Sequence, residues 1–278
     1  MSGGPDNGTI VNGTDYGTIV MVPGACSRPW VFNEFRGHFE AAGWRVETPG
    51  LRYHDPEPGQ PPDPRLAQTS LADYLDDLRR QIEALPEQPE RPERPVVMGH
   101  SMGGLLAQLL AARGLARAAI LLTPAPPWGM LPASENEIAA AMGLMSLGSI
   151  WEQTIAPVFE IAAQNSLNRL APERQRKVFA QFVPESGRAL FECLFWMFDL
   201  NRASYINAVN IECPLLVVAG GRDLAISTAT VQKITDKYRD LATYLEFPDM
   251  GHMLLLEDGW RDVAEACTDW LDDNLPKP

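Results

Sequence analysis

The sequence has no uninterrupted apolar run long enough to span a bilayer, which argues against a membrane-spanning protein. It also lacks an excess of basic residues, since 23 lysines and arginines stand against 36 acidic residues and give a net charge of −13. Such a charge disfavours nucleic acid and anionic membrane surfaces, so we expect neither as a partner. Residues 1–7 contain neither the basic nor the apolar segment of a secretory signal, which predicts a cytoplasmic protein.

Cysteine is scarce and widely spaced, with only Cys26, Cys193, Cys213 and Cys267 present. There is no Cys-x-x-Cys pair and no Cys/His cluster with metal-ligand spacing, so we expect neither a disulfide framework nor a metal site. Hydrophobic residues make up 45% of the 278 residues, which is enough for a sizeable core. The length suits one α/β domain with an insertion, or two domains.

Buried-strand patterns alternate with helical patterns in the first and last parts of the chain. Apolar or alternating runs predict strands at 18–22, 44–48, 95–98, 118–123, 214–219 and 243–247. Helical spacing predicts intervening helices, which include 30–42, a helix that begins with a capping-box pattern at Ser70–Asp73, 228–238 and one from Trp260. This alternation indicates a mostly parallel central sheet flanked by helices.

The alternation stops in the middle of the chain, where we find only helical patterns. We therefore expect a helical cap at 125–208, inserted into an α/β core formed by 17–124 and 209–278. Residues 1–16 are rich in glycine and asparagine and read as a flexible lead-in, with a short edge-strand pattern at Thr9–Val11.

Methionine and aromatic residues are dense in the expected cap. Most of them should hold the cap together and dock it on the core, while the remainder line an apolar substrate cavity. The residues that we predict to line this cavity are Cys26, Trp128, Met145 and Trp196.

One short stretch, Gly99-His100-Ser101-Met102-Gly103, has the pattern Gly-x-Ser-x-Gly. A buried-strand pattern precedes it and a run of helix formers follows it, which is the context of a nucleophile elbow. Side chains at the two glycine positions would collide as strand and helix approach each other. The pattern predicts that Ser101 is a nucleophile.

A serine hydroxyl needs an adjacent base, and the chain offers four histidines. His252 follows the last predicted strand, at the edge where the carboxyl ends of parallel strands gather, and we predict that it is the base. His38 falls within a predicted helix, and His100 should point away from Ser101. His54 adjoins a proline-rich loop and could border the site.

A carboxylate must hold the tautomer of the base. Asp223 follows a predicted strand and completes the chain order Ser…Asp…His, so we predict that it is the acid. Asp249 is the alternative, although its spacing from His252 is more typical of a turn. For the oxyanion hole we predict the backbone N–H groups of Met102, at the start of a helix, and of Ala25, in the small-residue loop after the first strand.

Four segments together resemble the plant methylesterase-like branch of the α/β-hydrolase superfamily and its bacterial relatives, over about residues 15–275; they are Val22–Cys26, Glu40–Trp44, Gly99–Gly104 and Gly251–Met253. The resemblance implies an α/β-hydrolase fold with a cap, serine-hydrolase chemistry and no cofactor. Pro23 stands where that branch usually has histidine. Gly24 and Met253 differ from the threonine and lysine usual in hydroxynitrile lyases, and Ser101 differs from the aspartate nucleophile of dehalogenases and epoxide hydrolases.

The sequence therefore predicts a serine hydrolase that cleaves a small hydrophobic carboxylic ester. A lactone, amide, thioester or carbon–carbon bond could be cleaved by the same triad, because cap and pocket set the substrate. A ligand-binding protein on the same scaffold is the alternative from another class, and a broken triad would favour it. Monomer and homodimer both remain open.

Overall fold

The computed structural model of the chain describes residues 16–57, 59–86 and 94–276. Its main strands are β1 (Thr18–Val22), β2 (Arg45–Glu47), β3 (Val96–His100), β4 (Ala118–Leu122), β7 (Leu215–Gly220) and β8 (Ala242–Phe247). They form one sheet in the order β2-β1-β3-β4-β7-β8, and every neighbouring pair is parallel. All the predicted core strands are present, and the predicted parallel sheet is confirmed. The predicted lead-in, except Tyr16, and the strand at Thr9–Val11 lie outside the described residues.

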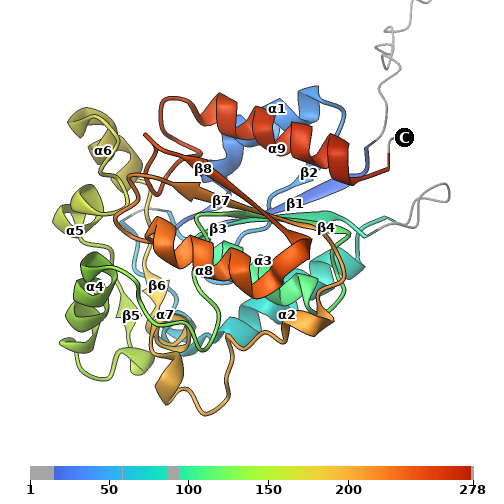
Figure 1. The fold of residues 1–278 in the computed structure, drawn as a ribbon. Coiled ribbons are helices and arrows are strands. Elements are labelled where there is room, and N and C mark those ends of the chain that lie inside the picture. The colour runs from blue at the N-terminus through green and yellow to red at the C-terminus, as the bar shows by residue number, and fades with distance from the viewer. Residues whose placement is uncertain (1–15, 58, 87–93, 277–278) are drawn as a thin grey trace, which may run out of the picture.

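Helices cover both faces of this sheet (Figure 1). One face carries α1 (Asn33–Ala41) and α9 (Trp260–Asn274), and the other carries α2 (Leu71–Glu83), α3 (Met102–Ala111) and α8 (Thr228–Tyr238). The predicted helix over 30–42 begins as a separate 3₁₀ turn at Pro29–Phe32. The α/β-hydrolase arrangement expected from the sequence is the observed one.

The two faces of the sheet bury two separate apolar clusters. In β1, Ile19 and Met21 pack toward α1 and α9, whereas Val20 and Val22 pack toward α2 and α3. Strands that are buried on both faces have continuous apolar sequences rather than alternating ones. This is why the sequence pattern identified these strands so clearly.

The segment inserted between β4 and β7 contains α4 (Glu135–Met145), α5 (Phe159–Gln164), α6 (Pro172–Phe179) and α7 (Gly187–Leu194), which lie on the left in Figure 1. It also contains a short antiparallel pair, β5 (Thr154–Ile155) with β6 (Glu185–Ser186). The expectation of helical patterns alone is therefore wrong here, because a two-residue strand is too short to show a period-two pattern.

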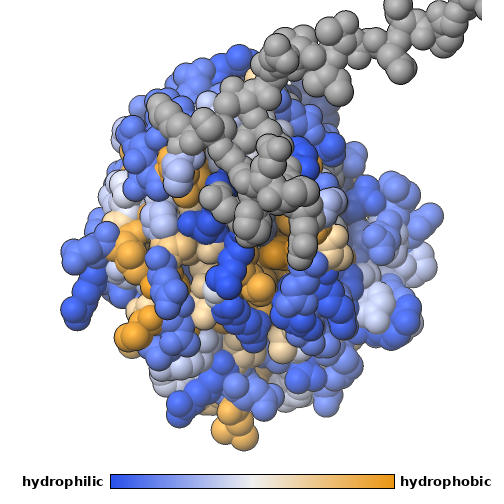
Figure 2. Space-filling model, turned by 90° about the vertical axis from the view of Figure 1, so that its right-hand side faces the viewer, coloured by the Kyte–Doolittle hydropathy of each residue, from blue (hydrophilic) through white to orange (hydrophobic). Residues whose placement is uncertain are grey.

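The surface differs between the cap and the opposite side of the molecule. Helix α4 buries none of its side chains, and Met142 and Met145 are 66% and 55% exposed. Figure 2 shows the side away from the cap, where hydrophilic residues cover most of the surface and apolar ones lie between them. Among the helices of the described ranges, none is long and apolar enough to cross a membrane.

Helices α2 and α4 offer a matched test of this difference, since both begin with a capping box. Ser70 pairs with Asp73 and Ser134 pairs with Glu137. We expect Ser70→Ala to lower the free energy of unfolding in urea by about 1 kcal/mol, because α2 is part of the core. Ser134→Ala should have a smaller effect, because α4 buries none of its side chains and Glu137 still bonds Ser227 and Thr230 at the start of α8. Equal losses in the two variants would contradict this account.

Candidate active site

Ser101 joins β3 to α3 in a sharp turn. Its backbone has φ 53° and ψ −120°, outside the regions that non-glycine residues normally occupy. Besides the bonds that its carbonyl accepts from α3, two backbone hydrogen bonds tie it to the segment after β4: its N–H donates to the carbonyl of Leu122 at 3.0 Å, and its carbonyl accepts from the N–H of Ala125 at 2.9 Å. The turn lies at the carboxyl edge of the sheet, where β3 ends.

The turn requires glycine on both sides of the serine. A Cβ atom at Gly99 would lie 2.1 Å from the carbonyl oxygen of Gly103, and a Cβ atom at Gly103 would lie 2.2 Å from that of Val22. Backbone atoms cannot move away as a flexible side chain could. The pattern Gly-x-Ser-x-Gly is therefore a direct consequence of how closely α3 approaches β3 and β1.

The structure brings together the three residues predicted as a triad. The Nε2 atom of His252 lies 3.0 Å from Oγ of Ser101, and its Nδ1 atom lies 2.8 Å from Oδ2 of Asp223. Since the carboxylate only accepts, Nδ1–H donates to Asp223 and leaves Nε2 free to accept the serine proton. The other carboxylate oxygen accepts from the N–H groups of Ala225 and Ile226 at 2.7 and 2.9 Å. The carboxylate facing His252 is thus Asp223 and not Asp249.

Several side chains hold the loop that carries His252. Glu257 accepts the N–H of Gly251 at 2.7 Å, while Thr123 Oγ1 and His100 Nε2 donate to the carbonyl of His252 at 3.1 and 2.9 Å. Burial, together with the neighbouring His252, lowers the pKa of His100 to about 3, so its ring is neutral. Glu257 could not be predicted from the sequence, because an isolated acid five residues after a histidine forms no motif.

The two segments predicted to form an oxyanion hole both border Ser101. Met102 is the first residue of α3, where backbone N–H groups have no partner within the helix. On the other side, a Cβ atom at Gly24 would lie 3.0 Å from Cβ of Ser101, so the loop that contains Ala25 lies directly against the serine. The helix start also favours negative charge at this position.

Cys26, the next residue of that loop, is held by the cap. Its N–H donates to Oε2 of Glu185 at 3.2 Å, and its carbonyl accepts from the N–H of Val183 at 3.0 Å. Burial and then the charge of Glu185 raise the pKa of the Cys26 thiol, so it stays protonated. In the described part of the chain, no group of three or more His, Cys, Asp or Glu side chains could hold a metal ion.

The cap residues predicted to line a substrate cavity have different surroundings. The rings of Trp128 and Trp196 meet edge to face with centroids 4.9 Å apart, and Trp196 donates to the carbonyl of Met130 at 3.0 Å. The guanidinium of Arg202 lies 5.0 Å from the centroid of the Trp128 ring. Met145, in contrast, lies on the exposed helix α4. The two tryptophans therefore form one cluster, and no contact joins the exposed Met145 to it among the described residues.

A buried carboxylate stands between cap and core. Glu185 accepts from Tyr74 Oη at 2.6 Å and from the N–H of Ser186 at 2.7 Å, and its second oxygen accepts from Cys26 and from His54 Nε2 at 3.1 Å. The Nδ1 atom of His54 faces the carbonyl of Arg52 at 3.0 Å. Both ring nitrogens of His54 thus face an acceptor oxygen, so each carries a proton. His54 is therefore an imidazolium ion beside an ionised Glu185.

The shifts in pKa agree with this charge assignment. Burial lowers the pKa of His54, but the Glu185 carboxylate, the hydrogen bond to the Arg52 carbonyl and the charge of Asp55 together outweigh burial and raise the pKa above its ordinary value. Burial likewise raises the pKa of Glu185, but His54 and the hydrogen-bond donors bring it below its ordinary value. Sequence reasoning noted His54 at the border of the site and missed Glu185, because only the folded chain brings the two together.

These shifts predict the sign of a pH effect on stability. Because folding raises the pKa of His54, protonated His54 stabilises the fold. This contribution is complete below the ordinary histidine pKa of about 6.5, and it is lost as the pH rises through the pKa of His54 in the folded protein. In urea titrations below that pH, we expect His54→Asn to lower the free energy of unfolding by about 3–5 kcal/mol. The difference from the wild type should shrink as the pH rises.

His38 provides the control of opposite sign. It lies in α1, 2.9 Å from Thr268 Oγ1, and burial lowers its pKa. The difference between the wild type and His38→Asn should therefore grow as the pH rises through the ordinary histidine value. A loss in His54→Asn that does not change with pH would contradict the charge assignment.

Comparisons with known proteins agree with this fold. A model of the alpha/beta hydrolase family matches residues 19–266. The methylesterase MES16 from Arabidopsis has a TM-score of 0.68 at 14% identity, over 92% of this chain and 98% of its own. The monoacylglycerol lipase of Paleococcus ferrophilus has a TM-score of 0.68 at 19% identity, over 95% and 97%. Polyneuridine aldehyde esterase has a TM-score of 0.65 at 16% identity, over 91% and 98%.

At these identities the structural likeness establishes the fold and not the substrate. No curated protein matches the sequence significantly. The family model, however, spans most of the chain, from the middle of β1 into α9. The protein belongs to the alpha/beta hydrolase family.

Proposed function

We propose that this protein is a serine hydrolase that cleaves a hydrophobic carboxylic ester through an acyl-enzyme on Ser101. The observation that carries the proposal is the unbroken hydrogen-bond chain from Ser101 through His252 to Asp223, with distances of 3.0 and 2.8 Å. Structural neighbours named as esterases and as a lipase support an ester as the substrate.

The first half of the reaction forms the acyl-enzyme. His252 takes the proton of Ser101 as Oγ attacks the ester carbonyl, and Asp223 stabilises the imidazolium that results. The N–H groups of Ala25 and Met102 donate to the oxygen of the tetrahedral intermediate. His252 then gives its proton to the leaving alcohol, and the acyl group stays on Ser101.

The second half releases the acid. Water replaces the alcohol, gives a proton to Nε2 of His252 and attacks the acyl carbonyl. The same two N–H groups stabilise the second tetrahedral intermediate. The collapse of this intermediate returns the proton to Oγ of Ser101. No step requires a cofactor.

An apolar acyl or alcohol group suits the cap. The Trp128–Trp196 pair offers a large apolar surface, and Cys26 contributes an uncharged thiol on the loop that contains Ala25. Met145 is exposed on α4. Lactones and thioesters would react by the same steps, so the substrate panel below includes them.

The test is hydrolysis of p-nitrophenyl esters of increasing acyl length, with a lactone, a thioester and an aryl amide alongside. We expect ester turnover, and a loss in kcat of about 10⁴- to 10⁶-fold in Ser101→Ala and in His252→Ala. The two losses should not add in the double variant, because the two residues act as a unit.

His38→Ala is the matched control for His252→Ala, since His38 lies in α1 and contacts α9 through Thr268. It should retain the ester kcat of the wild type. If neither ester nor any other panel member is turned over while an apolar ligand binds tightly, the proposal is wrong and a binding function is favoured.

A further inference from the structure

The loop that carries the Ala25 N–H is fixed by the cap rather than by the core alone. Both polar groups of the Cys26 backbone are bound there: the N–H by Glu185 of β6, at 3.2 Å, and the carbonyl by the N–H of Val183, at 3.0 Å. Cys26 itself has a left-handed φ of 59°, which is unusual for a residue with a side chain. The loop is therefore held in a costly conformation by contacts from an inserted segment.

Glu185 can hold the Cys26 backbone in place because several hydrogen bonds fix the position of its own carboxylate. It is fully buried, and its two oxygens accept from four donors on separate parts of the chain. Tyr74 of α2 and the imidazolium of His54 fix it from the core, so the carboxylate cannot follow Cys26 if the loop moves. A buried carboxylate with all its acceptor sites used is a rigid support.

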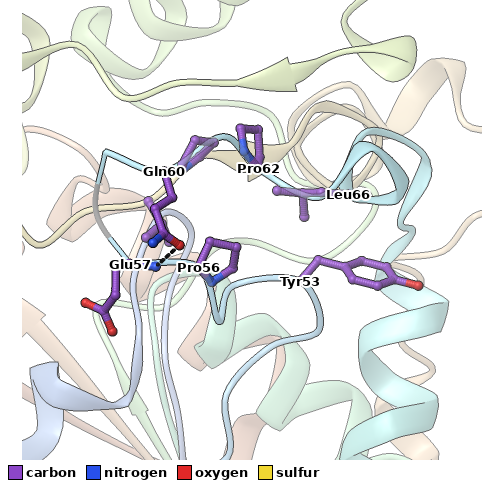
Figure 3. Close-up of a pocket in the computed structure, with 8 residues that line it drawn as sticks. Tyr53, Pro56, Glu57, Gln60, Pro62 and Leu66 are labelled. Carbon is purple, nitrogen blue, oxygen red and sulfur yellow. Dashed lines mark hydrogen bonds between the residues drawn. The ribbon is translucent and has the colours of Figure 1, made fainter.

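The segment that carries His54 is itself packed tightly against the cap. Tyr53, Pro56, Pro62 and Leu66, which Figure 3 labels, line a cavity of about 10 Å³ together with the cap residues Val183 and Pro184. That volume is close to the space one water molecule needs, so no substrate group can enter. The segment that carries His54 and the cap residues Val183 and Pro184 are therefore neighbours around this small hollow.

We propose that Glu185 is a positioning residue, which fixes the Cys26 peptide and so keeps the preceding N–H, that of Ala25, aimed at the oxyanion. The inference rests on the proposed serine-hydrolase function. It assigns to the cap a part in transition-state stabilisation, besides any part in substrate binding. Loss of Glu185 should therefore affect kcat much more than KM, because the oxyanion forms only after the substrate has bound.

The test compares two buried cap acids in the full chain. Glu185→Gln removes the charge that holds the oxyanion loop. Glu192→Gln is the matched control, because Glu192 is also buried and joins cap to core, but it accepts from the N–H of Leu71 at 2.7 Å and from Arg188 at 3.0 Å, away from the loop. Steady-state kinetics are measured on the p-nitrophenyl ester that the wild type hydrolyses fastest, together with Tm.

We expect Glu185→Gln to lower kcat between about 10- and 1,000-fold with KM within about twofold of the wild type, since one oxyanion donor is misplaced. Inhibition by a trifluoromethyl ketone, whose serine adduct carries an oxyanion, should weaken by the same factor as kcat/KM. Glu192→Gln should lower Tm but keep kcat and inhibitor affinity within about threefold of the wild type.

A wild-type kcat in Glu185→Gln, or equal losses of kcat in the two variants, would overturn the inference. If Glu185→Gln does not fold, Glu185→Asp retains the charge beside His54 but draws the carboxylate away from Cys26, and it should lose at least about tenfold in kcat. Wild-type kcat in that variant would overturn the inference as well. Absence of any wild-type ester turnover would instead overturn the proposed function, and this inference with it.

Discussion

The close contact between β3 and α3 is the constraint on which the rest of the site depends. No Cβ atom fits at Gly99 or Gly103, where it would lie 2.1 or 2.2 Å from a backbone oxygen. Because α3 lies this close to β3, the chain turns sharply at Ser101, and that residue takes a strained backbone conformation. Hydrogen bonds to residues 122 and 125 offset the strain, so the hydroxyl is fixed at the sheet edge before any substrate arrives.

The other groups are arranged around this fixed hydroxyl. Asp223 and His252 follow β7 and β8, and parallel strand order alone brings them to the same edge. Glu257 and Glu185 then hold the backbone N–H groups of Gly251, beside His252, and of Cys26, beside Ala25. Each of these two buried acids supports a segment beside Ser101, one from within the core and one from the cap.

The sequence was sufficient for the features that depend on local patterns. Strands buried on both faces appear as apolar runs in the sequence. Ser101, Asp223 and His252, which were selected from their order along the chain, are hydrogen-bonded to one another in the structure. Their catalytic roles stay predictions. Glu185 and Glu257 could not be found in this way, because a single acid gains its role from tertiary contacts. The pairing of β5 with β6 also escaped, because strands of two residues carry no periodicity.

Covalent trapping tests the central claim, that the elbow presents Ser101 as an activated nucleophile. The folded protein is incubated with a fluorophosphonate, and the modified peptide is located by mass spectrometry. The account predicts one phosphonyl adduct, on Ser101, which forms much more slowly in His252→Ala because the serine then has no base. No adduct on the wild type, an adduct on another residue, or an equal rate in the two proteins would contradict it.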